Sequence, residues 1–342
     1  MKTVDPSWEM PGSWKEPLQK FRNAFVSLWK RYGQFGQHVD IETGDIKVGG
    51  TNSAVMAIGG LALASVYEKD LELLRIAEKA ATYYFDRFTK PGISCGGPGE
   101  ILQNNDSESA FAMLESLITL YEVTGNKLWL KYAEDATGLC ATWVVSYDYK
   151  FPENSLFGNL DMRTAGSVWA NVQNKHSAPG ICTLSGDCLL KLYRATGKKV
   201  YMDLLRDIAH NIMQYISRED RPISDQHTGW INERVNLSDW ESPKRVGGIF
   251  KGNTWAQVSA MLTVAEIPGI YVNPSKKEIY VFDHVEAVLK GNQIEISNPT
   301  KFDATVSIFV DKDVPKIYPQ GFMSLCPRVL VKAGGNTFYK IN

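Results

Sequence analysis

The 342 residues are enough for one large domain, or for a large domain followed by a small one. Basic and acidic residues nearly balance, at 37 and 38, and no basic stripe runs along the sequence, so we expect no nucleic-acid partner. No apolar run approaches the ~18 residues of a membrane-spanning helix, and the first residues lack the apolar core of a signal peptide. We therefore expect no membrane partner, and a protein that is cytoplasmic or, with its leader removed, periplasmic or secreted.

The first 268 residues have the apolar spacing of helices and contain an internal repeat. Leu117–Asp135 matches Leu189–Asp207 at a constant offset of 72 residues, and Ala64–Lys79 is a weaker copy. In the two stronger copies a first helix ends at Thr-Gly, where glycine can adopt the left-handed conformation, and a second helix begins at once. This pattern predicts antiparallel helical hairpins. Further helices are expected over residues 18–32 and 253–269.

The links between the hairpins are long and rich in polar and aromatic residues. They cover about residues 90–105, 146–184 and 218–252. One hairpin cannot bury the apolar stripes of both its helices, so the hairpins must stack or close into a ring. All the long links would then emerge on one side, and we expect that side to carry the functional site.

From about residue 270 the apolar spacing changes to alternation, which indicates short antiparallel strands. Turns are expected at Lys290–Asn292 and Asn298–Pro299, and a further hairpin is expected with Gly334–Asn336 in its turn. About six or seven short strands predict a small β-sandwich. We therefore expect two domains, 1–268 and 269–342.

The repeated sequences LYEVTGNKLWLKYAED and LYRATGKKVYMDLLRD resemble those of six-hairpin glycosidase-like proteins, the (α/α)6 toroids. The resemblance covers about residues 14–268 and implies a mainly α fold, to which a C-terminal β-sandwich would be an accessory module. This class includes glycoside hydrolases, unsaturated-uronyl hydrolases, polysaccharide lyases and sugar 2-epimerases. About nine or ten helices are expected here, whereas a closed toroid has twelve. Either some helices are irregular, or the ring is incomplete, or the chain is part of a longer enzyme.

The resemblance implies a site where the inner helices begin, and three leading loops offer candidate residues there. In the first loop, Asn105 as N-cap would place Glu108 at N3 of a capping box, with Asp106 in the first helical turn. The alternative is that Asp106 or Glu108 is a catalytic carboxylate. In the second loop an indole could stack on a sugar ring, an amide could bind hydroxyls and an imidazole could donate a proton. The alternative there is a loop whose polar groups bond to its own backbone, with His176 solvated.

We expect a carbohydrate-active enzyme, a glycoside hydrolase that cleaves an oligo- or polysaccharide with two carboxylates. One carboxylate would come from Asp106 or Glu108, and the other from Asp225 or Glu233. The residues expected to bind the sugar are Asn104, Trp169, Gln173, His176, His227 and Trp230. Two alternatives are a uronic-acid lyase or sugar epimerase with His176 or His227 as base, and a non-catalytic glycan-binding or structural part of a larger enzyme. The five cysteines lack metal-binding spacing and no phosphate-binding loop is complete, so we expect buried thiols, no metal and no cofactor.

Overall fold

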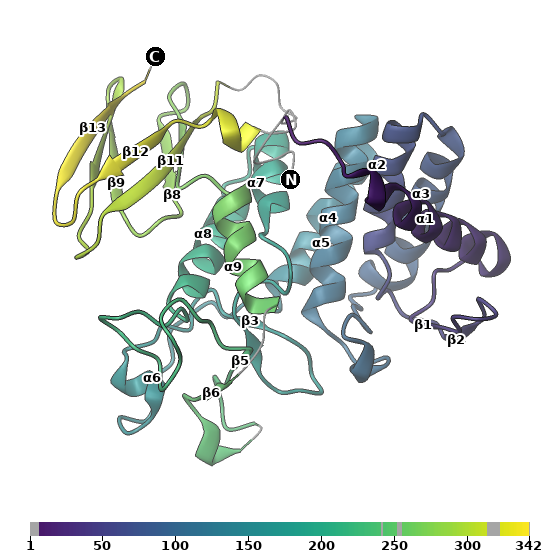
Figure 1. Ribbon diagram of the computed structural model, residues 1–342, viewed down its shortest axis with the longest axis horizontal. Helices are drawn as coiled ribbons and strands as arrows, with labels where there is room; N and C mark the ends of the chain where they lie inside the picture. Colours follow the sequence, from purple (N-terminus) through teal and green to yellow (C-terminus); the bar gives the residue numbers. More distant parts are fainter. Residues whose placement is uncertain (1–6, 241, 252–254, 313–321, 342) are drawn as a thin grey trace.

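The computed structural model describes residues 7–240, 242–251, 255–312 and 322–341. The long helices lie in the chain up to residue 266, separated by long links, and the longer strands follow them (Figure 1). The α-helices are α1 (Gly12–Tyr32), α2 (Met56–Glu68), α3 (Leu71–Tyr84), α4 (Ser107–Thr124), α5 (Lys127–Ala141), α6 (Leu156–Asn159), α7 (Asp187–Thr196), α8 (Val200–Met213) and α9 (Trp255–Glu266). None of the helices in these ranges has the length and apolarity to cross a membrane.

The sequence repeats form the predicted helical hairpins. α4 ends at Gly125 and α7 at Gly197, and both glycines are left-handed, with φ of 66° and 75°. The N–H of each glycine donates to a tyrosine carbonyl four residues earlier, Tyr121 or Tyr193, which satisfies a carbonyl that the helix end leaves unpaired. The weaker copy forms α2 and α3, where Lys69 takes the left-handed position at φ 57°. The prediction of three hairpins is therefore confirmed.

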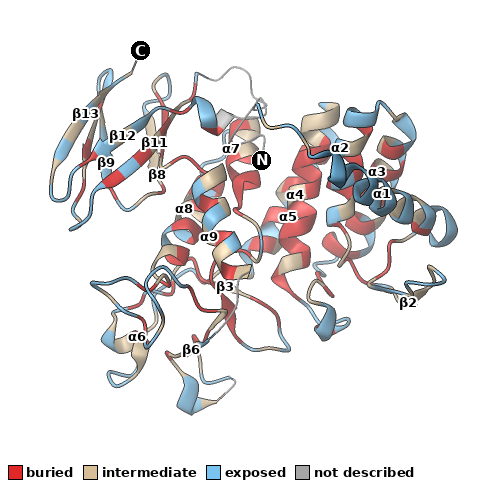
Figure 2. Cartoon of the chain, viewed as in Figure 1, coloured by how far each residue is buried: buried red, intermediate tan, exposed pale blue. Residues whose placement is uncertain are grey.

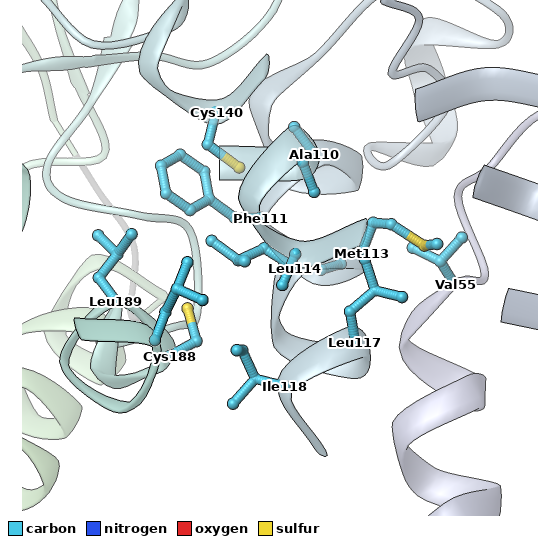
Figure 3. Close-up of a cluster of buried hydrophobic side chains, with 14 of the residues drawn as sticks. Val55, Ala110, Phe111, Met113, Leu114, Leu117, Ile118, Cys140, Cys188 and Leu189 are labelled. Atoms are coloured by element: carbon cyan, nitrogen blue, oxygen red, sulfur yellow. The ribbon is translucent and has the colours of Figure 1, made fainter. Parts of the chain in front are cut away.

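α4 is the centre of the largest hydrophobic core. It packs against α2, α5 and α7. Of the stripe expected on this helix, Phe111, Leu114, Leu117 and Ile118 are buried and Tyr121 is half-buried. Figure 3 shows these buried side chains of α4 meeting side chains of α7 and of the segment that precedes α2. Figure 2 shows α4 buried along most of its length, whereas α1 is largely exposed.

The long links between the hairpins lie on one side of the helices, as predicted. In Figure 1 the second and third links are the segments around α6, β3, β5 and β6, below the helices. A small antiparallel sheet in the order β3-β4-β5-β6 joins the second and third links. Its strands are β3 (Val168–Trp169), β4 (Ser177–Ala178), β5 (Arg234–Val235) and β6 (Ile249–Phe250). The shorter elements are β1 (His38–Val39), β2 (Ile46–Val48), the π-helix η1 (Phe85–Thr89), and the 3-10 helices η2 (Gly99–Ile101) and η3 (Pro243–Arg245).

The C-terminal strands form two sheets. One has the order β12-β11-β7-β8, with β7 and β11 parallel, and the other has the order β13-β10-β9. Apolar side chains of both sheets, among them Val272, Ile294 and Ile308, form one shared core. The elements are β7 (Ile270–Asn273), β8 (Glu278–Val281), β9 (Glu286–Lys290), β10 (Gln293–Ser297), β11 (Ala304–Val310), η4 (Phe322–Leu325), β12 (Arg328–Val331) and β13 (Asn336–Lys340).

One strand pairing differs from the expectation. The turn at Gly334–Asn336 does not close a hairpin, because β12 pairs with β11 and β13 pairs with β10. The turn therefore carries the chain from one sheet to the other. The local sequence does not distinguish a hairpin from a crossing between sheets, because a glycine-rich turn between two alternating segments fits both. The turn at Lys290–Asn292 does join two paired strands, β9 and β10.

The strands are anchored to the helices through α7. Arg194 donates to both carboxylate oxygens of Asp311, at 2.6 and 2.9 Å, and each side chain is only 3% exposed. Tyr271 of β7 also donates to Asp311, at 2.7 Å, and Tyr193 donates to Glu278 of β8. Removing either member of the Arg194–Asp311 pair would take the opposite charge away from the other buried group, which is costly. The boundary near residue 269 is therefore crossed by buried polar contacts.

Candidate functional site

Two of the long loops meet at the N-terminal end of α4. Asp106 forms a β-bridge with Asn171, and the N–H of Val172 donates to the carbonyl of Asn105 at 3.1 Å. The N–H of Ser107 donates to the carbonyl of Ala170 at 2.9 Å. These backbone bonds fix the first and second loops to each other, so their side chains share one region at the start of the helix.

Asp106 is the N-cap of α4. Its backbone is extended, and its fully buried carboxylate accepts from the N–H of Ser109 at 2.6 Å and from that of Gly97 at 2.9 Å. Burial raises the pKa of Asp106, although the hydrogen bonds from Ser109 and Gly97 oppose this. The expectation of Asn105 as N-cap with Glu108 at N3 is thus wrong by one residue, because the Asp106 carboxylate reaches the N3 amide itself.

Glu108 lies in the first turn of α4 and has no capping bond. Burial is the main reason why its pKa rises from the ordinary 4.5 to about 7. The charges of Asp106 and Glu100 raise this pKa further, and a hydrogen bond from the Cys182 thiol lowers it. Near neutral pH this carboxyl is therefore divided between its protonated and ionised forms, as a general acid requires.

Glu100 is a second carboxylate whose charge acts on Glu108, and sequence reasoning missed it. It is exposed, and Asn174 donates to it from its amide at 3.4 Å. The glycines before it were noted only as an incomplete phosphate loop. The structure gives Gly97 another role, because a Cβ there would lie 2.6 Å from the Asp106 carboxylate and 2.9 Å from the Cβ of Glu108. The sequence feature that could have pointed to Glu100 is the glycine-rich stretch before it, because glycines let a loop approach the start of a helix closely.

Amide side chains of the first and second loops also lie near the start of α4. Asn104 donates to the side-chain oxygen of Gln173 at 3.0 Å, which brings together two residues predicted to bind sugar. Each amide has further donor or acceptor capacity beyond this bond. His176 is buried rather than solvated, and its Nδ1 lies 2.8 Å from the carbonyl oxygen of Asn174. The second loop therefore contributes a fixed set of amides, and an imidazole anchored to its own loop.

The backbone around this cluster is strained. Leu102, Lys175 and Thr183 have positive φ, at 48°, 57° and 52°. Leu102 lies in the loop that leads into α4, and Lys175 and Thr183 lie in the loop that leads into α7. Positive φ is uncommon for residues other than glycine and persists only where the surroundings enforce it, which is frequent at functional sites.

Trp169 is half-buried at the edge of this region. Its ring meets that of Trp240 edge to face, with the centroids 6.1 Å apart, and the Lys175 ammonium lies 5.9 Å from the centre of the Trp240 ring. Trp240 is half-exposed, so this indole is the more accessible of the two for stacking on a ligand.

The third loop places its candidates in other surroundings. Asp225 is exposed and forms an ion pair with Lys251, which lowers the pKa of that carboxyl. Glu233 lies 3.5 Å from the guanidinium of its neighbour Arg234. His227 and Trp230 are exposed and pack edge to face on each other. The charges that raise the pKa of Glu108 are those of Asp106 and Glu100, with no contribution from Asp225 or Glu233.

The described residues contain no group of three or more His, Cys, Asp or Glu side chains placed to hold a metal ion. Four of the five cysteines are buried thiols, and Cys182, which contacts Glu108, is half-buried.

Comparisons with known proteins give no family. No protein-family model and no curated protein matches the sequence. Among solved structures, an unsaturated glucuronyl hydrolase from Streptococcus agalactiae is similar with a TM-score of 0.44 at 16% identity, over 74% of this chain and 55% of that one. A D-mannose isomerase is similar with a TM-score of 0.33 at 11% identity, over 74% of this chain and 81% of that one. The chain thus spans about half the length of the glucuronyl hydrolase that it resembles.

Proposed function

We propose that this protein is a carbohydrate-active enzyme, a glycoside hydrolase whose general acid is Glu108. The observation that carries the proposal is the Glu108 carboxyl, which is half-buried at the start of a core helix and has a pKa raised to about 7. General acids are most effective when their pKa lies near the working pH. A glycosidic bond needs such a proton donor at the leaving oxygen.

Glu100 is the proposed second carboxylate. It is exposed to solvent, whereas Glu108 is half-buried, and the two are close enough for the charge of Glu100 to raise the pKa of Glu108. Two neighbouring carboxyls in contrasting environments can divide the acid role from the nucleophile or base role. Asp106 is then a positioning residue, since its carboxylate is committed to Ser109 and Gly97. This assignment replaces Asp225 and Glu233 as partners, because Lys251 and Arg234 lie beside those two acids.

The sugar would be held by Asn104, Gln173 and Asn174, whose amides can exchange hydrogen bonds with hydroxyls. Trp240 would stack on a ring face from the edge of the region. A histidine base is less well supported, because His176 is anchored to the Asn174 carbonyl and His227 is exposed against Trp230.

We further propose that the hairpins of residues 1–268 belong to an (α/α) toroid and that the strands of 269–342 form an accessory β-sandwich. Antiparallel hairpins with their long links on one side support the first part. A core shared by a four-stranded and a three-stranded sheet supports the second.

The test is release of reducing sugar from a panel of plant, host and bacterial glycans. Glu108→Gln should abolish a release that wild type shows. Glu219→Gln is the matched control, because it removes an exposed loop carboxylate and should leave the release unchanged. Equal release by wild type and Glu108→Gln, or none from any glycan by wild type, would contradict the proposal.

A further inference from the structure

The link between α1 and α2 also reaches the candidate site. It contains β1 and β2, and Figure 1 shows these strands on the side of the helices where the other long links lie. Its residue Gln37 forms hydrogen bonds to the Glu100 loop, residues 95–105. Sequence reasoning did not include this link in the site, and its bonds to the Glu100 loop are what bring it there.

The Glu100 loop is closed at its base and packs on the start of α4. Cys95 forms a β-bridge with Asn105, so the two ends of the loop are joined. Beyond the base, the N–H of Gly97 donates to the Asp106 carboxylate at 2.9 Å. Compact loops whose ends are close depend on internal packing and bonding for their shape. The position of Glu100 therefore depends on the groups that hold the interior of this loop.

Gln37 supplies the hydrogen-bond donors for that interior. Its Nε2 lies 3.0 Å from the carbonyl oxygen of Leu102, 3.1 Å from that of Gly96 and 3.5 Å from that of Gly99. The Nε2 of His38 lies 3.1 Å from the same Gly99 oxygen. Carbonyl oxygens only accept hydrogen bonds, so their convergence is stable only around a donor. Because these carbonyls come from both arms of the Glu100 loop, the Gln37 amide ties the two arms together.

The backbone to which Gln37 binds is strained. Leu102 has φ of 48°, and Gly96 has φ of 87°. A Cβ at Gly96 would lie 3.0 Å from the carbonyl oxygen of Leu102, so the two arms approach each other closely. A leucine persists at positive φ only where its surroundings enforce it. The bond from Gln37 to the Leu102 carbonyl is one such restraint, and it acts two residues after Glu100.

The oxygen of the Gln37 amide indicates what the residue contributes. Oε1 is buried and has no hydrogen-bond partner in the part of the chain that the structure describes. An unpaired buried oxygen is unfavourable, and a methionine of similar length would avoid it. The backbone of Gln37 is held separately, because its N–H donates to the carbonyl of Val48 at 2.8 Å. The advantage of glutamine at this position therefore lies in the donors that it gives to the Glu100 loop.

We infer that Gln37 is a positioning residue of the proposed hydrolase, whose amide holds the Glu100 loop in the shape that keeps Glu100 at the site. Gln37 acts through the loop and takes no part in proton transfer. The second carboxylate reaches the substrate productively only while the loop keeps this shape. The inference rests on the proposed function for the role of Glu100, and on the contacts of Gln37 alone for the shape of the loop.

The first measurement is hydrogen exchange, which needs no substrate. Gln37→Met keeps the length of the side chain and removes the unpaired oxygen together with the donors, so we expect the fold to be retained. The backbone amides of residues 96–104 should exchange at least about tenfold faster than in wild type. Gln34→Met is the matched control, because Gln34 lies on the same link and bonds to Gly50 within it. It should leave this exchange unchanged.

The second measurement is the titration of Glu108 in wild type, Gln37→Met, Glu100→Gln and the double variant. The charge of Glu100 raises the pKa of Glu108, so displacement of Glu100 should lower the midpoint by a fraction of a pH unit. In the Glu100→Gln background Gln37→Met should give no further shift, because the charge is already gone. A residue that only stabilises the fold would shift the midpoint in both backgrounds or in neither. On any glycan that wild type cleaves, Gln37→Met should lower kcat/KM by about 10–10²-fold.

Gln37→Asn is the second variant and keeps the test decisive if Gln37→Met does not fold. It withdraws the amide from the carbonyls by one carbon but keeps a polar side chain, and it should have the same effects. Equal exchange in the Gln37 variants and Gln34→Met would overturn the inference. So would an unchanged Glu108 midpoint, or a shift that persists without the Glu100 charge. Full activity of Gln37→Met would overturn it and leave the proposed function standing. Faster exchange and a Glu100-dependent shift, without cleavage of any glycan by wild type, would contradict the proposed function and support the hold of Gln37 on the loop.

Discussion

Two carboxyls on α4 have much in common and differ in their neighbours. Glu108 and Glu115 are seven residues apart, so they lie on nearly the same side of the helix. Burial raises the pKa of each, to about 7 and about 8, and each has a hydrogen bond from a thiol, Cys182 or Cys188. The raised pKa by itself therefore does not distinguish a site from the interior of the fold.

The surroundings do distinguish them. The charges of Asp106 and of the exposed Glu100 act on Glu108, and Asn174 of the second loop donates to Glu100. Glu115 faces groups on α7 and α9, where the charges of Asp187 and Glu266 raise its pKa and that of Lys191 lowers it. We interpret the second group as a buried ion cluster that joins helices, and the first as the reactive centre. Substitutions around Glu108 and substitutions in the ion cluster around Glu115 should therefore have different kinds of effect.

The largest expected effect is on catalysis. Glu108→Gln should lower kcat/KM by about 10²–10⁴-fold, the usual contribution of a general acid, while Glu115→Gln should leave it within about twofold. Steady-state rates on any glycan that the wild type cleaves provide the measurement. Similar losses in both variants would mean that the comparison of neighbours fails to locate the reactive carboxyl.

The next effect is on stability. Lys191 lies 3.0 Å from Asp187 and 3.4 Å from Glu122, and its side chain is 19% exposed. Lys191→Met should lower the free energy of unfolding by about 3 kcal/mol, because it leaves buried carboxylates unpaired. Urea unfolding at pH 7 measures this change. The matched substitution is Lys198→Met. The Lys198 side chain pairs with Glu134 and is 56% exposed, so its loss should lower the free energy of unfolding by less than about 1 kcal/mol. Equal costs for the two lysines would contradict a buried ion cluster.

A smaller effect concerns pH. A carboxyl with a raised folded-state pKa makes the folded protein bind more protons than the unfolded one, so its contribution to stability is lost as pH rises from 4.5 to about 8. Glu115→Gln removes this loss and should raise the free energy of unfolding at pH 8 by on the order of 1 kcal/mol, with little gain at pH 4. Thermal unfolding across this pH range checks the sign. A gain that is largest at low pH would show that Glu115 is stabilised as the anion.

The smallest effect concerns the thiols. The hydrogen bond from Cys182 lowers the pKa of Glu108, so Cys182→Ala should move the alkaline limb of the pH–rate profile upward by a fraction of a pH unit. Cys188→Ala should not move this limb, because that thiol contacts Glu115. A downward shift in Cys182→Ala would mean that the thiol does not stabilise the anion of Glu108.

The sequence predicts the features that depend on local chemistry. The left-handed glycines at Gly125 and Gly197, the hairpins that they end and the common side of the long links all follow from short patterns. The placement of Asn104 beside Gln173 follows from the same reasoning, since both precede core helices on that side.

The remaining features depend on contacts between distant segments. The loop that carries Glu100 approaches the start of α4 closely at Gly97, and no spacing rule contains this contact. The N-cap at Asp106 is set by an amide three residues on and by Gly97 in another loop. The chain passes from one sheet to the other at Gly334 because β13 pairs with β10 rather than with β12. The even spacing of Glu108, Glu115 and Glu122 was visible in the sequence, but Lys191, which pairs with the last of them, lies on another helix.

Direct titration of the Glu108 carboxyl tests the central claim most closely. Carbon-13 NMR of labelled glutamate side chains would follow the resonance that disappears in Glu108→Gln. The account predicts a titration midpoint near pH 7, between the ordinary 4.5 and the value of about 8 for Glu115. A midpoint near 4.5 would contradict it, because Glu108 would then be ionised at neutral pH and unable to donate a proton.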